Sequence, residues 1–234
     1  MTGDLSGRLY LVTGASRGLG RATALALAGA GAKLVLVART VGALEELDDA
    51  QKALSGEPAV LVPLDLTDLD GIDRLGGALY DRYKKLDGLF AAAAQLTQLS
   101  PMGHMPPAAW EAMLRLNATA NYRLIRSLDP LLRAAPAGRA VFVTDRNNRN
   151  RAYWNAYDAS KAALETAVLS WAGELLKTQV KVNLAAPLPF ASRLRTAAFP
   201  GEDPKQQRQP DAVAKALLPL LLPATQRHGE IVEI

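Results

Sequence analysis

The sequence contains no cysteine, and it has only two histidines, His104 and His228, which lie far apart in the chain. The absence of cysteine excludes disulfides and thiolate metal sites. Two distant histidines make a histidine-based metal site unexpected as well, because zinc and similar ions need several such ligands together. We therefore expect no bound metal.

Long apolar runs and targeting patterns are also lacking. The longest apolar stretch, near Leu217 to Leu222, is only a few residues long and contains Pro219, so it cannot span a bilayer. The first residues, Met1 to Asp4, lack the basic-then-apolar pattern of a secretory signal. The sequence predicts a protein with no membrane partner, and its composition is typical of a cytoplasmic protein.

Positive charge is in small excess but is not concentrated. The net charge is +4 and the pI is about 9.4, yet the basic residues are mostly dispersed and form no long run. A nucleic-acid partner is therefore not expected. The one local excess is the segment Arg146 to Arg151, which has three arginines separated by asparagines.

Hydrophobic residues make up 49% of the 234 positions, and they form apolar runs that alternate with helix-length segments. The runs that predict strands are Leu9 to Thr13, Lys33 to Ala38, Ala59 to Leu64, Leu86 to Ala92, Ala140 to Thr144, Val180 to Leu184 and Glu230 to Glu233. The predicted helices are Gly18 to Ala30, Val41 to Leu54, Asp68 to Tyr83, Pro107 to Leu132, Tyr157 to Lys177 and Pro210 to Leu222.

This alternation predicts an α/β fold, a Rossmann-like doubly wound parallel sheet of about seven strands in a three-layer α/β/α arrangement. Ligands bind such sheets at the carboxyl ends of the strands. The connection from Ala186 to Gln209 shows no clear pattern and carries four prolines, which is typical of a lid or an irregular segment.

A glycine-rich turn follows the first predicted strand. It reads Thr13-Gly14-Ala15-Ser16-Arg17-Gly18-Leu19-Gly20 and leads directly into a predicted helix. Glycines allow a tight turn and let a pyrophosphate approach the backbone, while the helix N-terminus offers free N–H groups. The turn predicts a dinucleotide site with contacts from Gly14, Ser16, Arg17, Gly18, Leu19 and Gly20.

The end of the second strand predicts which dinucleotide is bound. NAD sites place a carboxylate there for the ribose 2′-hydroxyl, whereas this sequence has Arg39. Arg39 and Arg17 could hold a 2′-phosphate between them, so we expect NADP(H) to be favoured over NAD(H). Asp65, after the third strand, could meet the adenine amino group or cap the next helix, a role for which Asp68 competes.

Tyr157 and Lys161 stand four residues apart in the predicted helix from Tyr157 to Lys177 and so share one face of it. A nearby ammonium favours the phenolate and lowers the pKa of a tyrosine. Together with the glycine turn, Asp65-Leu66 and Asn117, this pair resembles the short-chain dehydrogenase/reductase family, and the resemblance extends from Gly7 to Ile234.

The resemblance implies specific roles. Tyr157 would be the general acid/base, Lys161 would hold the nicotinamide ribose and lower the pKa of Tyr157, and Asn117 would support a proton relay. A hydroxyl should orient the substrate carbonyl. The spacing back from Tyr157 selects Thr144, which we favour, whereas alignment of the fifth strand from its start selects Asp145. Cofactor contacts are also implied for Asp65, Leu66, Ala92, Tyr157, Lys161, Pro187 and Ser192.

Two segments depart from the family pattern. The usual Asn-Asn-Ala-Gly after the fourth strand is Ala91-Ala92-Ala93-Ala94 here, and Leu188 replaces a glycine after Pro187. Two hypotheses result. The first is an NADP(H)-dependent enzyme that interconverts a carbonyl and an alcohol. The alternative is a non-catalytic dinucleotide-binding protein with an eroded active site.

We expect residues 1–234 to form a single dinucleotide-binding oxidoreductase domain. Family members commonly form homodimers or homotetramers through their two long helices, and apolar residues of the second helix, Leu164, Val168 and Trp171 among them, predict such a contact here. The arginines of segment 146–151 should border the substrate cleft, where they could bind an anionic group of a small-molecule substrate.

Overall fold

The computed structural model describes residues 4–234; residues 1–3, on which the expected absence of a signal peptide partly rests, lie outside the described residues. Seven parallel strands form one sheet in the order β3-β2-β1-β4-β5-β6-β7, which confirms the predicted doubly wound topology. The strands are β1 (Leu9–Thr13), β2 (Lys33–Ala38), β3 (Val60–Pro63), β4 (Gly88–Ala91), β5 (Arg139–Val143), β6 (Lys181–Ala186) and β7 (Glu230–Glu233).

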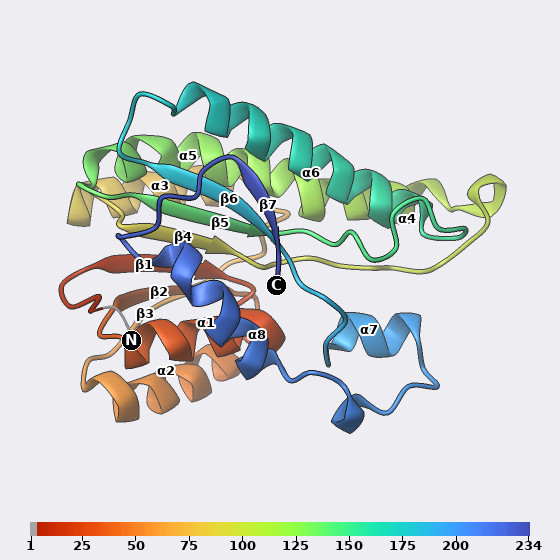
Figure 1. The fold of residues 1–234 in the computed structure, drawn as a ribbon, viewed down its shortest axis with the longest axis horizontal. Coiled ribbons are helices and arrows are strands. Elements are labelled where there is room, and N and C mark those ends of the chain that lie inside the picture. The colour runs from red at the N-terminus through yellow and green to blue at the C-terminus, as the bar shows by residue number, and fades with distance from the viewer. Residues whose placement is uncertain (1–3) are drawn as a thin grey trace.

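Helices cover both faces of the sheet and make three layers (Figure 1). One face carries α1 (Gly18–Gly29), α2 (Val41–Ser55) and α8 (Pro210–Leu217), and the other carries α3 (Leu69–Tyr83), α5 (Ala120–Ala134) and α6 (Asn155–Glu174). Two shorter helices, α4 (Pro107–Leu114) and α7 (Arg193–Ala198), lie beyond the carboxyl ends of the strands (Figure 1). Short 3-10 turns occur at Met102–His104, Pro204–Gln206 and Leu218–Leu221.

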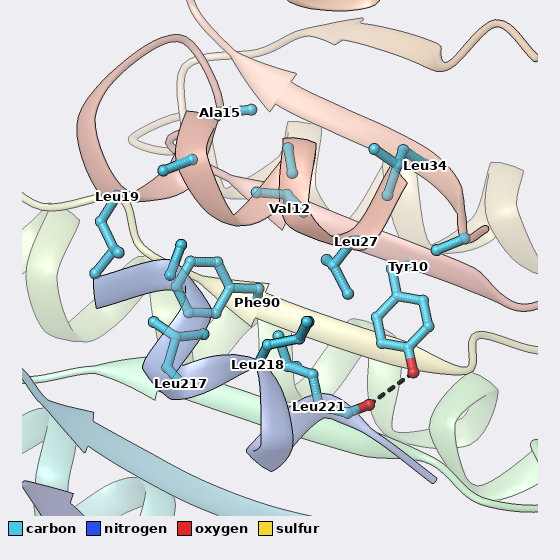
Figure 2. Close-up of a cluster of buried hydrophobic side chains, with 14 of the residues drawn as sticks. Tyr10, Val12, Ala15, Leu19, Leu27, Leu34, Phe90, Leu217, Leu218 and Leu221 are labelled. Atoms are coloured by element: carbon cyan, nitrogen blue, oxygen red, sulfur yellow. Dashed lines mark hydrogen bonds between the residues drawn. The ribbon is translucent and has the colours of Figure 1, made fainter. Parts of the chain in front are cut away.

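The central strands are apolar on both sides because both of their faces are covered. In the layer between the sheet and α1 and α8, Tyr10 reaches across the core and donates a hydrogen bond of 2.7 Å to the carbonyl of Leu221 (Figure 2). This bond satisfies the one polar atom of a ring that is otherwise fully buried, and burial raises the pKa of the Tyr10 hydroxyl. The bond thereby ties β1 to the 3-10 turn at Leu218–Leu221.

Three expectations need correction. The helix predicted from Pro107 to Leu132 consists of α4 and α5, joined by a π turn at Arg115–Thr119. A π turn contains one residue more than an α-helical turn, and the hydrophobic periodicity of the sequence does not reveal it. The irregular connection from Ala186 to Gln209 contains α7 and a 3-10 turn.

The third correction concerns α6. Leu164, Val168 and Trp171 are at most 5% exposed and pack into the chain's own core, so they leave no surplus apolar face. The outward positions are small residues, including Ala163 and Ala167.

None of the helices that the structure describes has the length and apolar character that a bilayer span requires.

Candidate active site

A cleft of about 860 Å³ opens at the carboxyl ends of the strands, where the fold predicts a ligand. Its walls include every residue that the sequence predicted for cofactor binding: Gly14, Ser16, Arg17, Gly18, Leu19, Gly20, Arg39, Asp65, Leu66, Ala92, Tyr157, Lys161, Pro187 and Ser192. Thr144 and Asp145 also line it. The topology thus brings segments 14–20, 37–39, 64–67, 92–96, 143–161 and 187–199 to one place.

The three glycines of the first turn have different reasons to lack a side chain. A Cβ on Gly20 would lie 2.2 Å from the carbonyl oxygen of Gly14, and a Cβ on Gly14 would lie 2.9 Å from the amide nitrogen of Ala93. These two glycines therefore permit backbone packing. Gly18 has a φ of +54°, and a Cβ there would meet nothing within 4 Å, so it faces open space at the start of α1.

This turn fits the pyrophosphate of a dinucleotide. Gly18 begins α1, where the first backbone N–H groups have no partner within the helix and carry partial positive charge. No acidic side chain stands in the first turn of α1 to oppose an anion. When bound there, a nicotinamide dinucleotide would supply hydride to the far end of the cleft, where Tyr157 and Lys161 lie.

Arg39 and Asp65 form an exposed ion pair at the end of the cleft next to β2 and β3, with 3.7 Å between guanidinium nitrogen and carboxylate oxygen. Asp65 also accepts hydrogen bonds from the backbone N–H and the hydroxyl of Thr67. Burial would raise the pKa of Asp65, but the bonds from Thr67 and the charge of Arg39 together lower it. Asp68, not Asp65, caps α3. Arg39 is therefore held only by a long, exposed ion pair, and it lines the same cleft as Arg17 of the first turn.

Lys161 and Tyr157 are both buried on α6 at the centre of the cleft. The Lys161 ammonium donates a hydrogen bond of 2.9 Å to the carbonyl of Val143 at the end of β5, and it lies 5.8 Å from the centre of the Tyr157 ring. Burial lowers the pKa of Lys161 to about 8, although the charges of Asp145 and Glu165 oppose this shift. The tyrosine and lysine side chains therefore lie together in the cleft.

The electrostatics of Tyr157 differ from the expected tuning. Burial is the largest cause that raises its pKa well above the ordinary value, and the charges of Asp145 and Asp158 and a hydrogen bond to Asp145 add to the rise. A neighbouring lysine alone would have the opposite effect. Burial first, and then the negative charge of Asp145 in the same cleft, thus favour the neutral phenol.

Thr144 and Asp145 are the two residues considered for the substrate-orienting role, and their side chains serve different partners. The Thr144 hydroxyl donates a 2.6 Å hydrogen bond to Glu165, one turn of α6 beyond Lys161, and the residue is only 2% exposed. Asp145 is half-buried and acts on Tyr157 and Lys161 through its charge. The Thr144 hydroxyl is therefore bound within the chain, whereas the Asp145 carboxylate acts on the Tyr157–Lys161 pair.

Asn117 is fully buried in the π turn and binds the segment that follows β4. Its amide accepts a 2.9 Å bond from the Gln95 N–H and donates a 2.9 Å bond to the Gln95 carbonyl. The Asn117 amide also donates a bond to the Ser160 hydroxyl of α6, again at 2.9 Å. The side chain of Asn121 in turn donates a bond to the backbone carbonyl of Asn117. Asn117 therefore holds the Ala91–Gln95 segment against α6, a structural task that is compatible with the relay implied by the resemblance.

The three arginines of segment 146–151 do not line the cleft that residues 4–234 form. Arg149 makes ion pairs with Asp158 at 3.0 Å and with Glu165 at 2.6 Å. Arg146 lies 4.0 Å from Glu165. Arg151 stacks on the ring of Phe199, 5.4 Å from its centre. These contacts hold the loop between β5 and α6 in place and leave Arg149 committed to carboxylates of the chain itself.

Sequence reasoning missed two groups of site residues. Glu165, which joins Thr144 to Arg149, follows Lys161 by four residues on the buried face of α6, and that spacing could have identified it. The other group is the aromatic wall, in which Trp154 lies 5.7 Å from Tyr157 and 5.8 Å from Phe199 between ring centres. No local sequence pattern predicts the position of Phe199. It follows α7, a helix that was not predicted because the segment around it contains four prolines.

Comparisons with known proteins show which family the chain belongs to. The family model for short chain dehydrogenase matches residues 8–203. An uncharacterised oxidoreductase of Escherichia coli, YciK, is 32% identical over 209 residues, which are 88% of this chain and 82% of that protein. A 3-oxoacyl-[acyl-carrier-protein] reductase of rhamnolipid biosynthesis in Pseudomonas aeruginosa is 33% identical over 199 residues, 82% of this chain and 76% of the relative.

Solved structures show the same fold in detail. A short chain dehydrogenase of Escherichia coli in complex with NADPH superposes with a TM-score of 0.94 at 30% identity, covering 100% of this chain and 98% of the other. A second one, from Shigella flexneri and in complex with NADP, has the same TM-score and identity. The sheet order, the glycine turn, the Tyr157–Lys161 pair and these matches place the chain in the short-chain dehydrogenase/reductase family, as an NAD(P)-dependent oxidoreductase.

Proposed function

We propose that this chain uses NADP(H) to transfer hydride to and from the carbon of a polar double bond in a small molecule. The carbonyl–alcohol pair is the case that the family resemblance implies. The observation that carries the proposal is the continuous cleft that joins the Gly14–Gly20 turn to Tyr157 and Lys161. In it, Lys161 would hold the nicotinamide ribose, and the Tyr157 hydroxyl would bind the heteroatom of the double bond and exchange a proton with it.

The preference for NADP(H) is supported by Arg39 and Arg17 at the adenosine end, and by relatives that were crystallised with NADPH or NADP. A ketoacid or carrier-linked acyl substrate is suggested by the name of the Pseudomonas aeruginosa relative. The arginines of segment 146–151 do not support an anionic substrate, because Arg149 is already paired and the described walls of the cleft exclude all three.

The test combines a titration of cofactor binding, followed by NADPH fluorescence, with NADPH oxidation against a panel of carbonyl compounds and imines. Saturable NADPH binding and turnover with at least one compound support the proposal. Tyr157→Phe should bind NADPH like the parent protein and lose turnover by about a hundredfold or more. Tyr80→Phe, a substitution of the same kind on the exposed surface of α3, is the matched control and should change neither property. NADPH binding without any turnover would favour the non-catalytic alternative.

We further propose that the chain assembles as a homodimer or homotetramer through α5 and α6. Their outward faces carry Tyr122, which is 54% exposed, and small residues such as Ala163 and Ala167 that let two helices approach closely. Sedimentation at micromolar concentrations should give at least twice the mass of 24.9 kDa. A monomer mass across that range would contradict the assembly.

A further inference from the structure

The proposed function requires a side chain that contacts the substrate next to Tyr157, and Asp145 is in a position to do so. The role inferred for Asp145 rests on that proposed function. It lines the cleft beside Tyr157 and Lys161. Two bonds from Asn147, one from its backbone N–H at 2.9 Å and one from its amide at 3.2 Å, both reach Oδ1 of Asp145. The second carboxylate oxygen therefore keeps lone pairs for Tyr157 and for a ligand. A carboxylate accepts hydrogen bonds and cannot donate one, so its complement is an N–H or O–H donor.

The walls next to Asp145 favour a cation among such donors. Trp154 and Tyr157 line this end of the cleft as adjoining rings, and aromatic faces attract organic cations. Phe199 also lines it, but its ring already contacts the guanidinium groups of Arg151 at 5.4 Å and Arg195 at 4.4 Å, so it serves as an apolar wall. Two basic side chains of α7, Arg193 and Arg195, also belong to the cleft wall. Arg195 is paired with Glu202 through two hydrogen bonds of 2.7 and 2.6 Å, and Arg193 is exposed to solvent.

The position of a carboxylate beside the phenol also disfavours an ordinary ketone. When a neutral carbonyl is reduced, the new alkoxide must take a proton, and the phenolate left on Tyr157 would face the negative charge of Asp145. A protonated C=N bond needs no such proton, because it becomes a neutral amine when hydride arrives. The raised pKa of Tyr157 is then no obstacle, since the phenol stays neutral throughout.

We propose that the substrate of this cleft is a protonated imine, whose N–H⁺ group binds the Asp145 carboxylate and whose hydrocarbon part lies against Trp154 and Phe199. In the reduction the carbon of the C=N⁺ bond gains a hydride from NADPH as co-reactant, the π electron pair passes to nitrogen, and the nitrogen keeps its proton. The product is the amine, and the dinucleotide is oxidised to NADP⁺. Tyr157 acts in this reaction by holding the nitrogen in place, and Asp145 supplies the charge that selects it.

The experiment compares two pairs of bicyclic probes of similar size. Dihydroisoquinoline, a cyclic imine that is protonated near neutral pH, is compared with the ketone tetralone in NADPH oxidation. The amine tetrahydroisoquinoline is compared with the alcohol tetralol in calorimetric binding to the protein loaded with NADP⁺. We expect the imine and the amine to be favoured over the ketone and the alcohol by about tenfold to a hundredfold, the range for one shielded, charge-assisted bond.

Two variants test whether Asp145 is the cause. Asp145→Ser, which restores a hydroxyl donor, should remove the preference for the amine and leave NADPH affinity unchanged. Asp158→Asn is the matched control, because Asp158 also acts on Tyr157 but pairs with Arg149 outside the cleft wall. It should keep the preference.

The outcomes separate this inference from the proposed function. Failure to bind NADPH would refute the proposed function itself. Normal NADPH binding with equal or stronger affinity for tetralol would overturn the imine proposal alone, and so would a preference that survives in Asp145→Ser. Should Asp145→Ser fail to fold, the ratio of amine to alcohol affinity in the unmodified protein decides the matter.

Discussion

The two halves of the cleft are built on different principles. On the dinucleotide side, β1, β2 and the Gly14–Gly20 turn rely on backbone shape, and the contacts that matter are between main-chain atoms. On the substrate side, the ends of β4, β5 and β6 rely on side-chain chemistry, and there Ala91–Ala94, Asp145 and Leu188 all depart from the family pattern. The comparison indicates that the backbone of the glycine turn can be retained while the side chains on the other side of the cleft change and a carboxylate is present among them.

The largest expected effect tests the dinucleotide side. In Gly20→Ala, the new Cβ would lie 2.2 Å from the Gly14 carbonyl oxygen, and neither backbone can move without opening the turn. We expect a loss of about 3 kcal/mol in the free energy of unfolding, together with loss of NADPH binding. Urea denaturation and a fluorescence titration measure the two effects.

Gly29→Ala is the control for that substitution. Gly29 ends the same helix, α1, and nothing lies within 4 Å of its added Cβ. Alanine there should leave NADPH binding intact and change stability by less than about 1 kcal/mol. If both substitutions lowered the unfolding free energy and NADPH binding equally, the close packing at Gly20 would not be the reason that the turn requires glycine.

The second prediction concerns the buried ion pairs on the substrate side. Glu165→Gln removes the charge that holds Arg149, while its amide can still accept the Thr144 hydroxyl bond and Asp158 still pairs with Arg149. We therefore expect a loss of about 2 kcal/mol in unfolding free energy, below the full cost of stranding a buried charge. Glu174→Gln, on the exposed end of α6, should cost almost nothing in the same denaturation assay.

The third prediction asks whether charge on the dinucleotide side selects the cofactor. Arg39→Asp replaces the cation beside Asp65 by a second carboxylate, so NADPH affinity should fall about tenfold or more relative to NADH. Arg74→Asp breaks a similar exposed arginine–aspartate pair on α3, outside the cleft, and serves as the control. Equal affinities for NADPH and NADH in the unmodified protein would remove the basis for this prediction.

The smallest effect is a displaced titration. The Asp145 carboxylate raises the pKa of Tyr157 because it opposes the phenolate, and it raises the pKa of Lys161 because it favours the ammonium. Asp145→Asn should therefore lower both, and Lys161 should lose its proton below its present pKa of about 8. Phenolate absorbance against pH follows Tyr157, with Tyr157→Phe as the blank. An unchanged or higher tyrosine pKa in the variant would contradict the assigned charge contact.

Sequence reasoning was most successful where chain geometry decides the structure. The strands of the sheet and the glycine turn carry their signals locally, in apolar runs and in residues that a tight turn requires. The cleft positions of Tyr157 and Lys161 followed from helix spacing and the family resemblance. The orientation of Thr144 could not be predicted, because it depends on Glu165, a partner 21 positions away.

The remaining differences have the same origin. The π turn around Asn117 is stabilised by contacts to Gln95 and Ser160, which come from other elements of the fold. The arginine-rich segment looked like a substrate wall because its charge was counted without its carboxylate partners, Asp158 and Glu165. Charges on a loop can be assigned to a ligand only when the chain's own counter-charges have been placed.

The contact between Gly14 and Ala93 has a consequence for mutational tolerance. The atoms that would meet a Cβ on Gly14 are the backbone nitrogen and Cα of Ala93, with the carbonyl carbon of Ala92 behind them. Since such a contact does not depend on the side chains at positions 92 and 93, this strand end can change its residues while it continues to support the phosphate turn. Asn117 adds to this freedom by binding the backbone of Gln95 through both of its amide atoms. The substrate side can therefore accumulate substitutions without a penalty in cofactor geometry, and that is a route by which one scaffold can acquire new substrates.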